Sequence, residues 1–278
     1  MNNHVNLFGE SEENLAKLVK KYCHLVTKTD LSSEDAQNIT KILDYSVYDQ
    51  GLNYWLSEAD QIIDYQLSTG SIPDYDLVVS SLSIKNLVHN LTRDPSDKVT
   101  DRVRFETFKK LVKQTELKGK FLEKYKSFSK KSFSRKAIFQ TKISFKNTEK
   151  DLTIYMIGWK PGQTTHTVHH HGQSLDAIKV YQGEMTHWFV DQRREPEEVI
   201  STPGDIINKN EFVCIKRKQH HFIANNSSQD LVTLHFRFGA PPDNDNWVKL
   251  PDECKPEAMW SDSNEDMEGV CRLMTSSP

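Results

Sequence analysis

WKPGQTTHTVHHHGQSLD, residues 159–176, is the stretch of sequence that decides how the fold is interpreted. It opens with a Pro-Gly turn signal and contains three consecutive histidines. Successive side chains on a β-strand point to opposite faces, so His169 and His171 would share one face while His170 points the other way. As a strand, this segment presents two imidazoles to one metal ion.

The chain offers a third imidazole further on. Eight of its eleven histidines lie between His166 and His235, about a quarter of the chain. His220 and His221 are neighbours, so only one of them points inward on a regular strand. Three histidines from two strands would leave positions open for a substrate or dioxygen, as in non-haem iron oxygenases. The competing interpretation is that these are ordinary core or surface histidines, which single motifs do not exclude.

The sequence changes character near Lys131. From about Ser11 to about Leu122 the apolar residues recur at helical spacing. Within this half, Ser32 to Asp35 has the pattern of a capping box, and Gly51 and Gly70 are predicted helix stops. Beyond it, short β-branched runs are separated by turn residues, which favours a sandwich or barrel. The predicted class is α+β.

Composition and charge exclude several classes of protein. A net charge of −3 provides no field that would attract nucleic acid or an anionic membrane, so neither is an expected partner. No apolar run approaches the length of a membrane span, and residues 1–14 have no signal-peptide pattern, which predicts a cytoplasmic protein. The four cysteines form no closely spaced pair and predict neither a zinc site nor disulfides.

These motifs resemble the cupin superfamily, whose fold is a double-stranded β-helix barrel. The first cupin motif places a glycine before His-x-His, followed by an acidic residue and a second glycine. The second motif is a histidine with an asparagine four residues later. The matching positions are Gly162, His169, His171, Asp176 and Gly183 for the first motif, and His221 and Asn225 for the second. The resemblance therefore selects His221, rather than His220, as the third ligand.

Within the cupins, residues from about Phe105 to Pro242 resemble the cysteine dioxygenases. Trp159 to Gln163 resembles the family's Trp-x-Pro-Gly-His/Gln turn, and Thr233 to Phe236 with Ala240 to Pro242 resembles its Ser-Leu-His strand and closing Pro-Pro. Phe133-Ser-Arg135 matches the family's Tyr-x-Arg, whose arginine binds the substrate carboxylate. The resemblance implies Fe(II) as the cofactor, no organic cofactor, and Arg135 as the substrate-binding residue.

Two positions depart from the family pattern. Asp176 stands where mammalian-type members have a cysteine, and Arg237 stands where the tyrosine crosslinked to it would be, so no thioether cofactor can form. Asp176 is open to two interpretations, as a fourth metal ligand or as a hydrogen-bond acceptor for a ligating imidazole. Thr233, His235 and Arg237 alternate on one strand, which predicts a polar barrel interior with His235 and Arg237 in catalytic roles.

The predicted domains are a helical N-terminal extension over 1–103, a cysteine dioxygenase-like cupin domain over 104–245 and a partly irregular tail over 246–278. The leading functional hypothesis is an Fe(II)-dependent dioxygenase that oxidises a small carboxylate-bearing thiol to a sulfinate. A second is a cupin oxygenase or isomerase with a non-thiol substrate and Asp176 as ligand or base. A third is a binding or sensing protein whose helical region recruits a partner. The sequence leaves the oligomeric state open.

Overall fold

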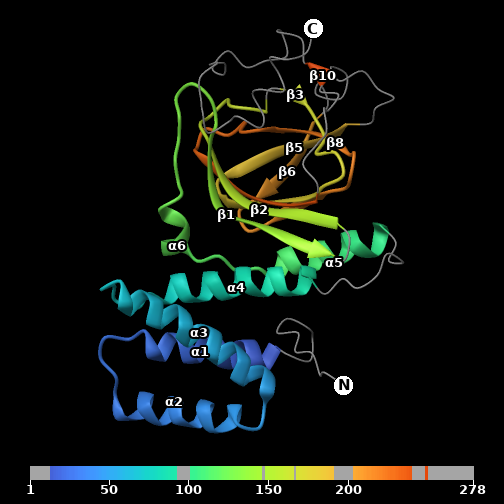
Figure 1. Cartoon of the computed structure of the whole chain (residues 1–278). Coiled ribbons are helices and arrows are strands. Elements are labelled where there is room, and N and C mark those ends of the chain that lie inside the picture. Colours follow the sequence, from blue (N-terminus) through green and yellow to red (C-terminus); the bar gives the residue numbers. More distant parts are fainter. Residues whose placement is uncertain are drawn as a thin grey trace. The chain divides into compact units, whose positions relative to one another are not determined.

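The computed structural model describes residues 13–92, 101–145, 148–165, 167–190, 203–239 and 248–249. The chain forms two compact units, shown in Figure 1. The helical unit comprises residues 1–97 and 110–124, and the β unit comprises residues 98–109 and 125–278. The unit boundary falls inside helix α5 (Asp101–Gln114). None of the described helices combines the length and the apolarity that a membrane crossing requires.

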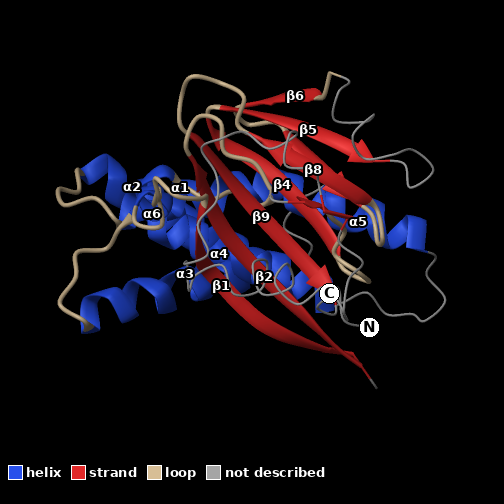
Figure 2. Cartoon of the chain, turned by 90° about the horizontal axis from the view of Figure 1, so that it is seen from above, coloured by secondary structure: helices blue, strands red, loops and turns tan. Residues whose placement is uncertain are grey.

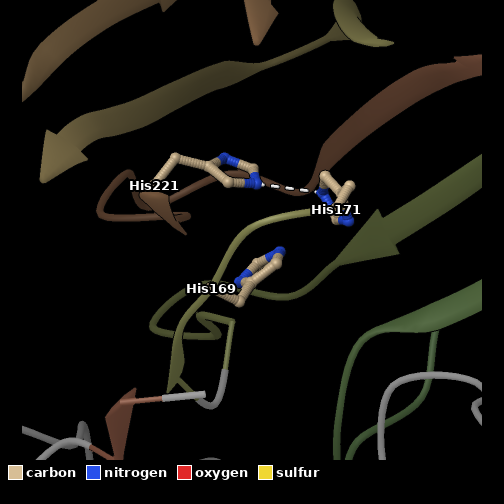
Figure 3. Close-up of side chains that lie close together, drawn as sticks. All are labelled: His169, His171 and His221. Atoms are coloured by element: carbon tan, nitrogen blue, oxygen red, sulfur yellow. Dashed lines mark hydrogen bonds between the residues drawn. The ribbon is translucent and has the colours of Figure 1, made fainter. Parts of the chain in front are cut away.

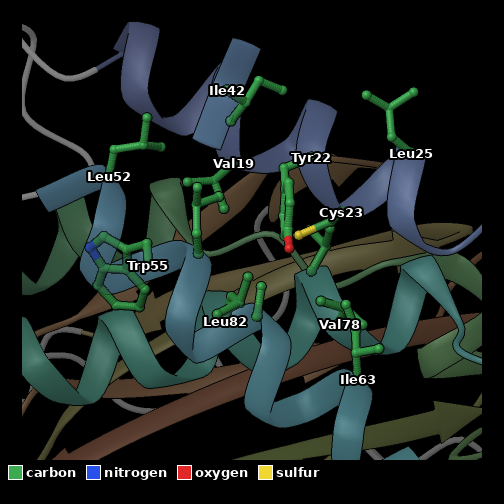
Figure 4. Packing of buried hydrophobic residues seen from close by; sticks show 13 residues of the cluster. Val19, Tyr22, Cys23, Leu25, Ile42, Leu52, Trp55, Ile63, Val78 and Leu82 are labelled. Carbon is green, nitrogen blue, oxygen red and sulfur yellow. The ribbon is translucent and has the colours of Figure 1, made fainter. Parts of the chain in front are cut away.

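The helical unit packs its helices around one apolar core. Its other helices are α1 (Glu13–Val26), α2 (Ser33–Ser46), α3 (Gln50–Ser68), α4 (Tyr75–Thr92) and the short α6 (Gly119–Glu123). Trp55 and Leu52 of α3 are almost fully buried, and Val19 of α1 lies among the same cluster (Figure 4). Helices α1, α2, α3 and α4 therefore direct apolar side chains to a shared core.

Local signals explain the ends of α2 and α3. Ser32 and Asp35 form the predicted capping box, which satisfies backbone N–H groups at the start of α2. Gly70 follows α3 with φ +74°, as expected of a helix stop. The prediction of a stop at Gly51 was wrong: it lies in the first turn of α3, where the Asp49 side chain caps the backbone N–H of Gly51.

The β unit is built from two antiparallel sheets and a short strand pair. The larger sheet has the order β1-β2-β9-β4-β7, the smaller sheet has the order β6-β5-β8, and β3 pairs with β10. The strands are β1 (Ser134–Phe145), β2 (Thr148–Trp159), β3 (Thr167–Val168), β4 (Leu175–Gln182), β5 (Glu184–Val190), β6 (Asp205–Asn208), β7 (Phe212–Ile215), β8 (His220–Ala224), β9 (Leu231–Gly239) and β10 (Val248–Lys249).

The strand order is that of a double-stranded β-helix. An isolated bridge between His169 and His221 adds the β3 segment beside β8. The strands therefore form two four-strand layers, with the orders β2-β9-β4-β7 and β3-β8-β5-β6. This is the strand order of a jelly roll. Figure 2 shows β1, β2, β9 and β4 side by side, followed by β8, β5 and β6. The predicted α+β class with a cupin-type barrel is confirmed.

Both sheets contribute side chains to the barrel interior. Ile178 and Tyr155 of the larger sheet share an apolar cluster with Met185 and Ile223 of the smaller sheet. Gly183 makes the tight β4–β5 turn with φ +79°, and a Cβ atom there would lie 2.7 Å from the Asp230 carbonyl oxygen. The second glycine of the cupin motif is therefore required by backbone conformation and by close approach. Pro241 and Pro242, and the predicted tail except β10, lie outside the described residues.

Candidate metal centre

Three histidines converge inside the barrel. One nitrogen of each of His169, His171 and His221 lies within 4.8 Å of the others, and all three side chains are buried. Figure 3 shows their rings directed at a common space. The outward neighbours His170 and His220 instead pair with each other, at a ring separation of 4.5 Å. The period of two sorts His220 and His221 on β8. The strand predicted to run through His171 ends earlier, since β3 covers Thr167–Val168 and His169 extends it only by an isolated bridge to His221.

The three inward imidazoles fit a divalent transition metal. Burial, followed by the nearby charge of Arg237, lowers the pKa of His171 well below its usual range. Burial, followed by the charge of His169, does the same to the pKa of His221. The rings of His171 and His221 are therefore neutral, and a neutral imidazole offers the nitrogen lone pair that a metal needs. A buried set of three such nitrogens can hold a metal ion.

Asp176 lies with Arg237 rather than with the three histidines. Its Oδ1 accepts a hydrogen bond from Nε of Arg237 at 3.0 Å, across the β4–β9 ladder in which the two residues stand opposite each other. Its Oδ2 is buried without a hydrogen-bond partner in the described part of the chain. Burial raises the pKa of Asp176, against the influence of Arg237. Among the described residues, the metal-competent group contains the three histidines and no carboxylate.

Arg237 connects this carboxylate to the histidines. Its Nη2 lies 2.6 Å from Nδ1 of His171, and Nε2 of His171 lies 3.0 Å from Nε2 of His221. Nη2 also lies 3.3 Å from Nε2 of the same ring, and the shorter contact, to Nδ1, is the hydrogen bond. A guanidinium can only donate hydrogen bonds, so Nδ1 of His171 is the acceptor and the proton of that ring is on Nε2. This proton is donated to Nε2 of His221, which must therefore carry its own proton on Nδ1.

His187 is a functional candidate to which the sequence analysis assigned no role. Its Nε2 lies 3.2 Å from Nδ1 of His221, and its side chain is fully buried. Alternation along β5 places His187 on the inner face with Met185, which is the signal that could have identified it. A second histidine thus stands behind one of the three candidate ligands.

A second polar group lies on the inner face of the larger sheet. Thr233 Oγ1 accepts a hydrogen bond from Trp159 Nε1 at 2.9 Å and lies 2.9 Å from Nε2 of His235. Tyr155 stacks on His235, with ring centroids 4.9 Å apart and an interplanar angle of 15°. The structure therefore joins Thr233 and His235, as their alternation predicted, and adds Tyr155 from β2.

The two arginines both approach the Tyr155 ring. The guanidinium carbon of Arg135 lies 5.1 Å from the ring centre, and that of Arg237 lies 5.7 Å from it. Nη2 of Arg237 also donates to the Tyr155 hydroxyl at 3.2 Å. Arg135, which the resemblance to the Tyr-x-Arg motif singled out, therefore lies beside the polar inner face. Sequence reasoning missed Tyr155 because it lies in the apolar run 152–157.

Comparison with known proteins yields structural likeness alone. No family model and no curated protein sequence matches the chain. A double-stranded β-helix protein from Klebsiella pneumoniae is 16% identical with a TM-score of 0.34, covering 46% of this chain and 88% of that one. The protein TT1209 from Thermus thermophilus is 15% identical with a TM-score of 0.35, covering 45% and 99%. An oxalate oxidase is 16% identical with a TM-score of 0.28, covering 33% and 44%.

At these values the likeness says nothing about activity. The strand order and the histidine cluster define the class: a protein with a cupin-type double-stranded β-helix and a buried three-histidine site suited to a metal ion. The more particular resemblance to cysteine dioxygenases depends on the sequence motifs.

Proposed function

We propose that this protein is an Fe(II)-dependent dioxygenase that oxidises a small carboxylate-bearing thiol to a sulfinate. The observation that carries the proposal is the cluster of His169, His171 and His221, whose nitrogens lie within 4.8 Å of one another. The cluster is buried, and the guanidinium groups of Arg135 and Arg237 both lie near the buried Tyr155 ring in the same unit. A facial set of three protein ligands leaves open positions, as oxygenase chemistry requires.

His169, His171 and His221 would hold the iron. When bound, the iron supplies open coordination positions at which a thiolate and dioxygen can react. The overall reaction adds both oxygen atoms of O2 to the sulfur of RSH and gives RSO2H. Sulfur loses four electrons and dioxygen gains four, so no further reductant is needed.

The charges near Tyr155 favour a substrate with one carboxylate. Arg135 and Arg237 contribute two positive charges, and Asp176 compensates one of them through its contact with Arg237. Among the described residues that approach Tyr155 this leaves one positive charge, on Arg135, which does not share the Asp176 carboxylate. A planar guanidinium can hold a carboxylate through two parallel hydrogen bonds, so Arg135 would orient the substrate beside the histidine cluster.

His235 would act on the bound substrate from outside the metal's ligand set. Its Nε2 is engaged with Thr233, which leaves Nδ1 for a hydrogen bond to substrate. Burial, followed by the charge of Arg237, lowers the pKa of His235 well below its usual range, so this nitrogen acts in a neutral ring. Stacking on Tyr155 fixes the plane of the imidazole.

Oxygen consumption tests the proposal directly. The protein is purified without oxygen, loaded with Fe(II), and assayed with cysteine, mercaptopropionate, cysteamine and matched acids that lack sulfur. We expect uptake that requires a thiol, yields a sulfinate and is abolished in the His169→Ala variant. Carboxylate-bearing thiols should exceed cysteamine, which has no carboxylate. Absence of uptake with every thiol, in protein shown to contain iron, would overturn the assignment.

Asp176 supports a second candidate, a metal-dependent cupin that acts on a non-thiol substrate. Its Oδ2 has no hydrogen-bond partner among the described residues, and its raised pKa suits a general base. Asp176→Asn separates the two candidates. It should abolish proton abstraction from a carbon acid, whereas thiol-dependent oxygen uptake should persist.

A further inference from the structure

His187 occupies an inner position where an apolar side chain would suffice. It lies on β5 opposite Ile223 of β8, and Met185 is the preceding inward residue on its own strand. Its side chain has no exposed surface. Within the described residues, its Nδ1 is buried without a hydrogen-bond partner. A polar ring in such surroundings lowers the stability of the fold, so its remaining contact calls for a functional explanation.

That remaining contact is with a candidate metal ligand. Nε2 of His187 lies 3.2 Å from Nδ1 of His221, and the two rings are tilted by 34°. Nε2 of His221 faces the histidine cluster, where it lies 3.0 Å from Nε2 of His171. Both nitrogens of His221 are therefore committed, one to the cluster and one to His187.

We propose that His187 is a positioning residue that holds His221 as the Nδ1–H tautomer, with the Nε2 lone pair directed at the metal site. The proposal rests on the metal site proposed above. One chain of contacts leads to this tautomer. Arg237 can only donate to His171, which makes His171 donate to Nε2 of His221, and His187 accepts the proton that His221 then carries on Nδ1.

The arrangement prepares His221 for a metal before the metal binds. A ligating imidazole needs its lone pair on one nitrogen and a hydrogen-bond acceptor for the proton on the other. His221 has both, whereas Nε2 of His171 still carries the proton that a metal must replace. His187 also accepts through a rigid, fully buried ring, so His221 loses rotational freedom in the metal-free protein.

The tautomer can be observed in the metal-free protein. Nitrogen-15 NMR of histidine-labelled protein distinguishes Nδ1–H from Nε2–H imidazoles, and a His221→Gln variant assigns the relevant signals. We expect His221 to be the Nδ1–H form in the wild type and to lose this preference in His187→Phe. A His221 ring found as Nε2–H in the wild type would overturn the proposal.

Metal affinity gives a second readout. Co(II) and Fe(II) are titrated against a coloured chelator into wild type, His187→Phe, His187→Gln and the control His24→Phe, which removes an exposed histidine of the helical unit. We expect His187→Phe to bind metal about 10- to 100-fold more weakly, the usual effect of losing such a partner. Gln presents an acceptor near the same place, so His187→Gln should recover most of the affinity, and His24→Phe should match the wild type.

The outcomes separate this inference from the proposed function. Equal metal affinity in wild type and folded His187→Phe, or no recovery in His187→Gln, contradicts a positioning role. Should the wild type bind no metal, the iron site fails, and the tautomer of the metal-free protein alone decides the inference about His187. Should His187→Phe fail to fold, the wild-type tautomer and His187→Gln decide it.

Discussion

Acid should destabilise the metal-free protein in a pH range set by its buried histidines, and His187 allows the effect to be calculated. Burial lowers the pKa of His187 from 6.5 to about 4. Below pH 6.5 His187 is therefore protonated in the unfolded chain, whereas in the folded chain it stays neutral until about pH 4. The free energy of unfolding is therefore highest above pH 6.5, where the ring is neutral in both states, and it decreases as the pH falls from 6.5 toward 4.

The magnitude follows from the two pKa values. A pKa difference of one corresponds to about 1.4 kcal/mol, so the whole transition of His187 is worth about 3 kcal/mol. At pH 5 roughly 2 kcal/mol of this is already lost, since the unfolded ring is almost fully protonated there and the folded ring is not. Burial lowers the pKa values of His171, His221 and His235 in the same direction, which adds to the loss.

Urea unfolding in the presence of EDTA, at pH 7.5 and pH 5, measures this linkage. The wild type should lose more free energy of unfolding between these two pH values than His187→Phe, by about 2 kcal/mol. His24→Phe, which removes an exposed histidine, should follow the wild type. If His187→Phe and the wild type lose the same free energy between pH 7.5 and pH 5, His187 is not a buried neutral ring and the reasoning fails.

Three further substitutions test the rest of the structure. Thr233→Val should lower the free energy of unfolding by about 1–3 kcal/mol, because Trp159 Nε1 and His235 Nε2 lose their shared partner, and denaturant unfolding checks this. Gly183→Ala should destabilise the protein more than Gly70→Ala, since both glycines have positive φ but only Gly183 would also clash with the Asp230 carbonyl; equal melting temperatures would contradict this. Arg135→Gln should lower kcat/KM for a carboxylate-bearing thiol about 10- to 100-fold, mainly through KM, and should leave cysteamine unaffected in steady-state assays.

The strand period predicted that only one of His220 and His221 points inward, and the resemblance to the second cupin motif, with Asn225 four residues after His221, selected His221. Alternation is a local property, and the structure directs His221 to the cluster while His220 pairs with His170 on the other side. The helical N-terminal region and the barrel were predictable for the same reason, since both depend on short-range periodicity. The stop assigned to Gly51 failed because a glycine is also tolerated in the first turn of a helix, where Asp49 already provides the cap.

The partners within the site depend on long-range strand pairing, which the sequence does not display. Asp176 stands opposite Arg237 only because β4 pairs with β9 in one particular register. Tyr155 stands opposite His235 only because β2 lies on the other side of β9. A shift of one residue in either register would move these side chains to the outer face. The ion pair, the stacked tyrosine and the role of His187 therefore required three-dimensional structure.

The polar interior is difficult to explain by stability alone. His169, His171, His187, His221 and His235 are all buried in the β unit. Each neutral ring removes polar nitrogen atoms from water, and leucine or isoleucine at the same positions would pack without that cost. The sequence does use apolar inward residues elsewhere in the same barrel, such as Ile178, Met185 and Ile223. Departures from the stable pattern that gather at one place, and that hydrogen-bond to one another, are the mark of a functional site.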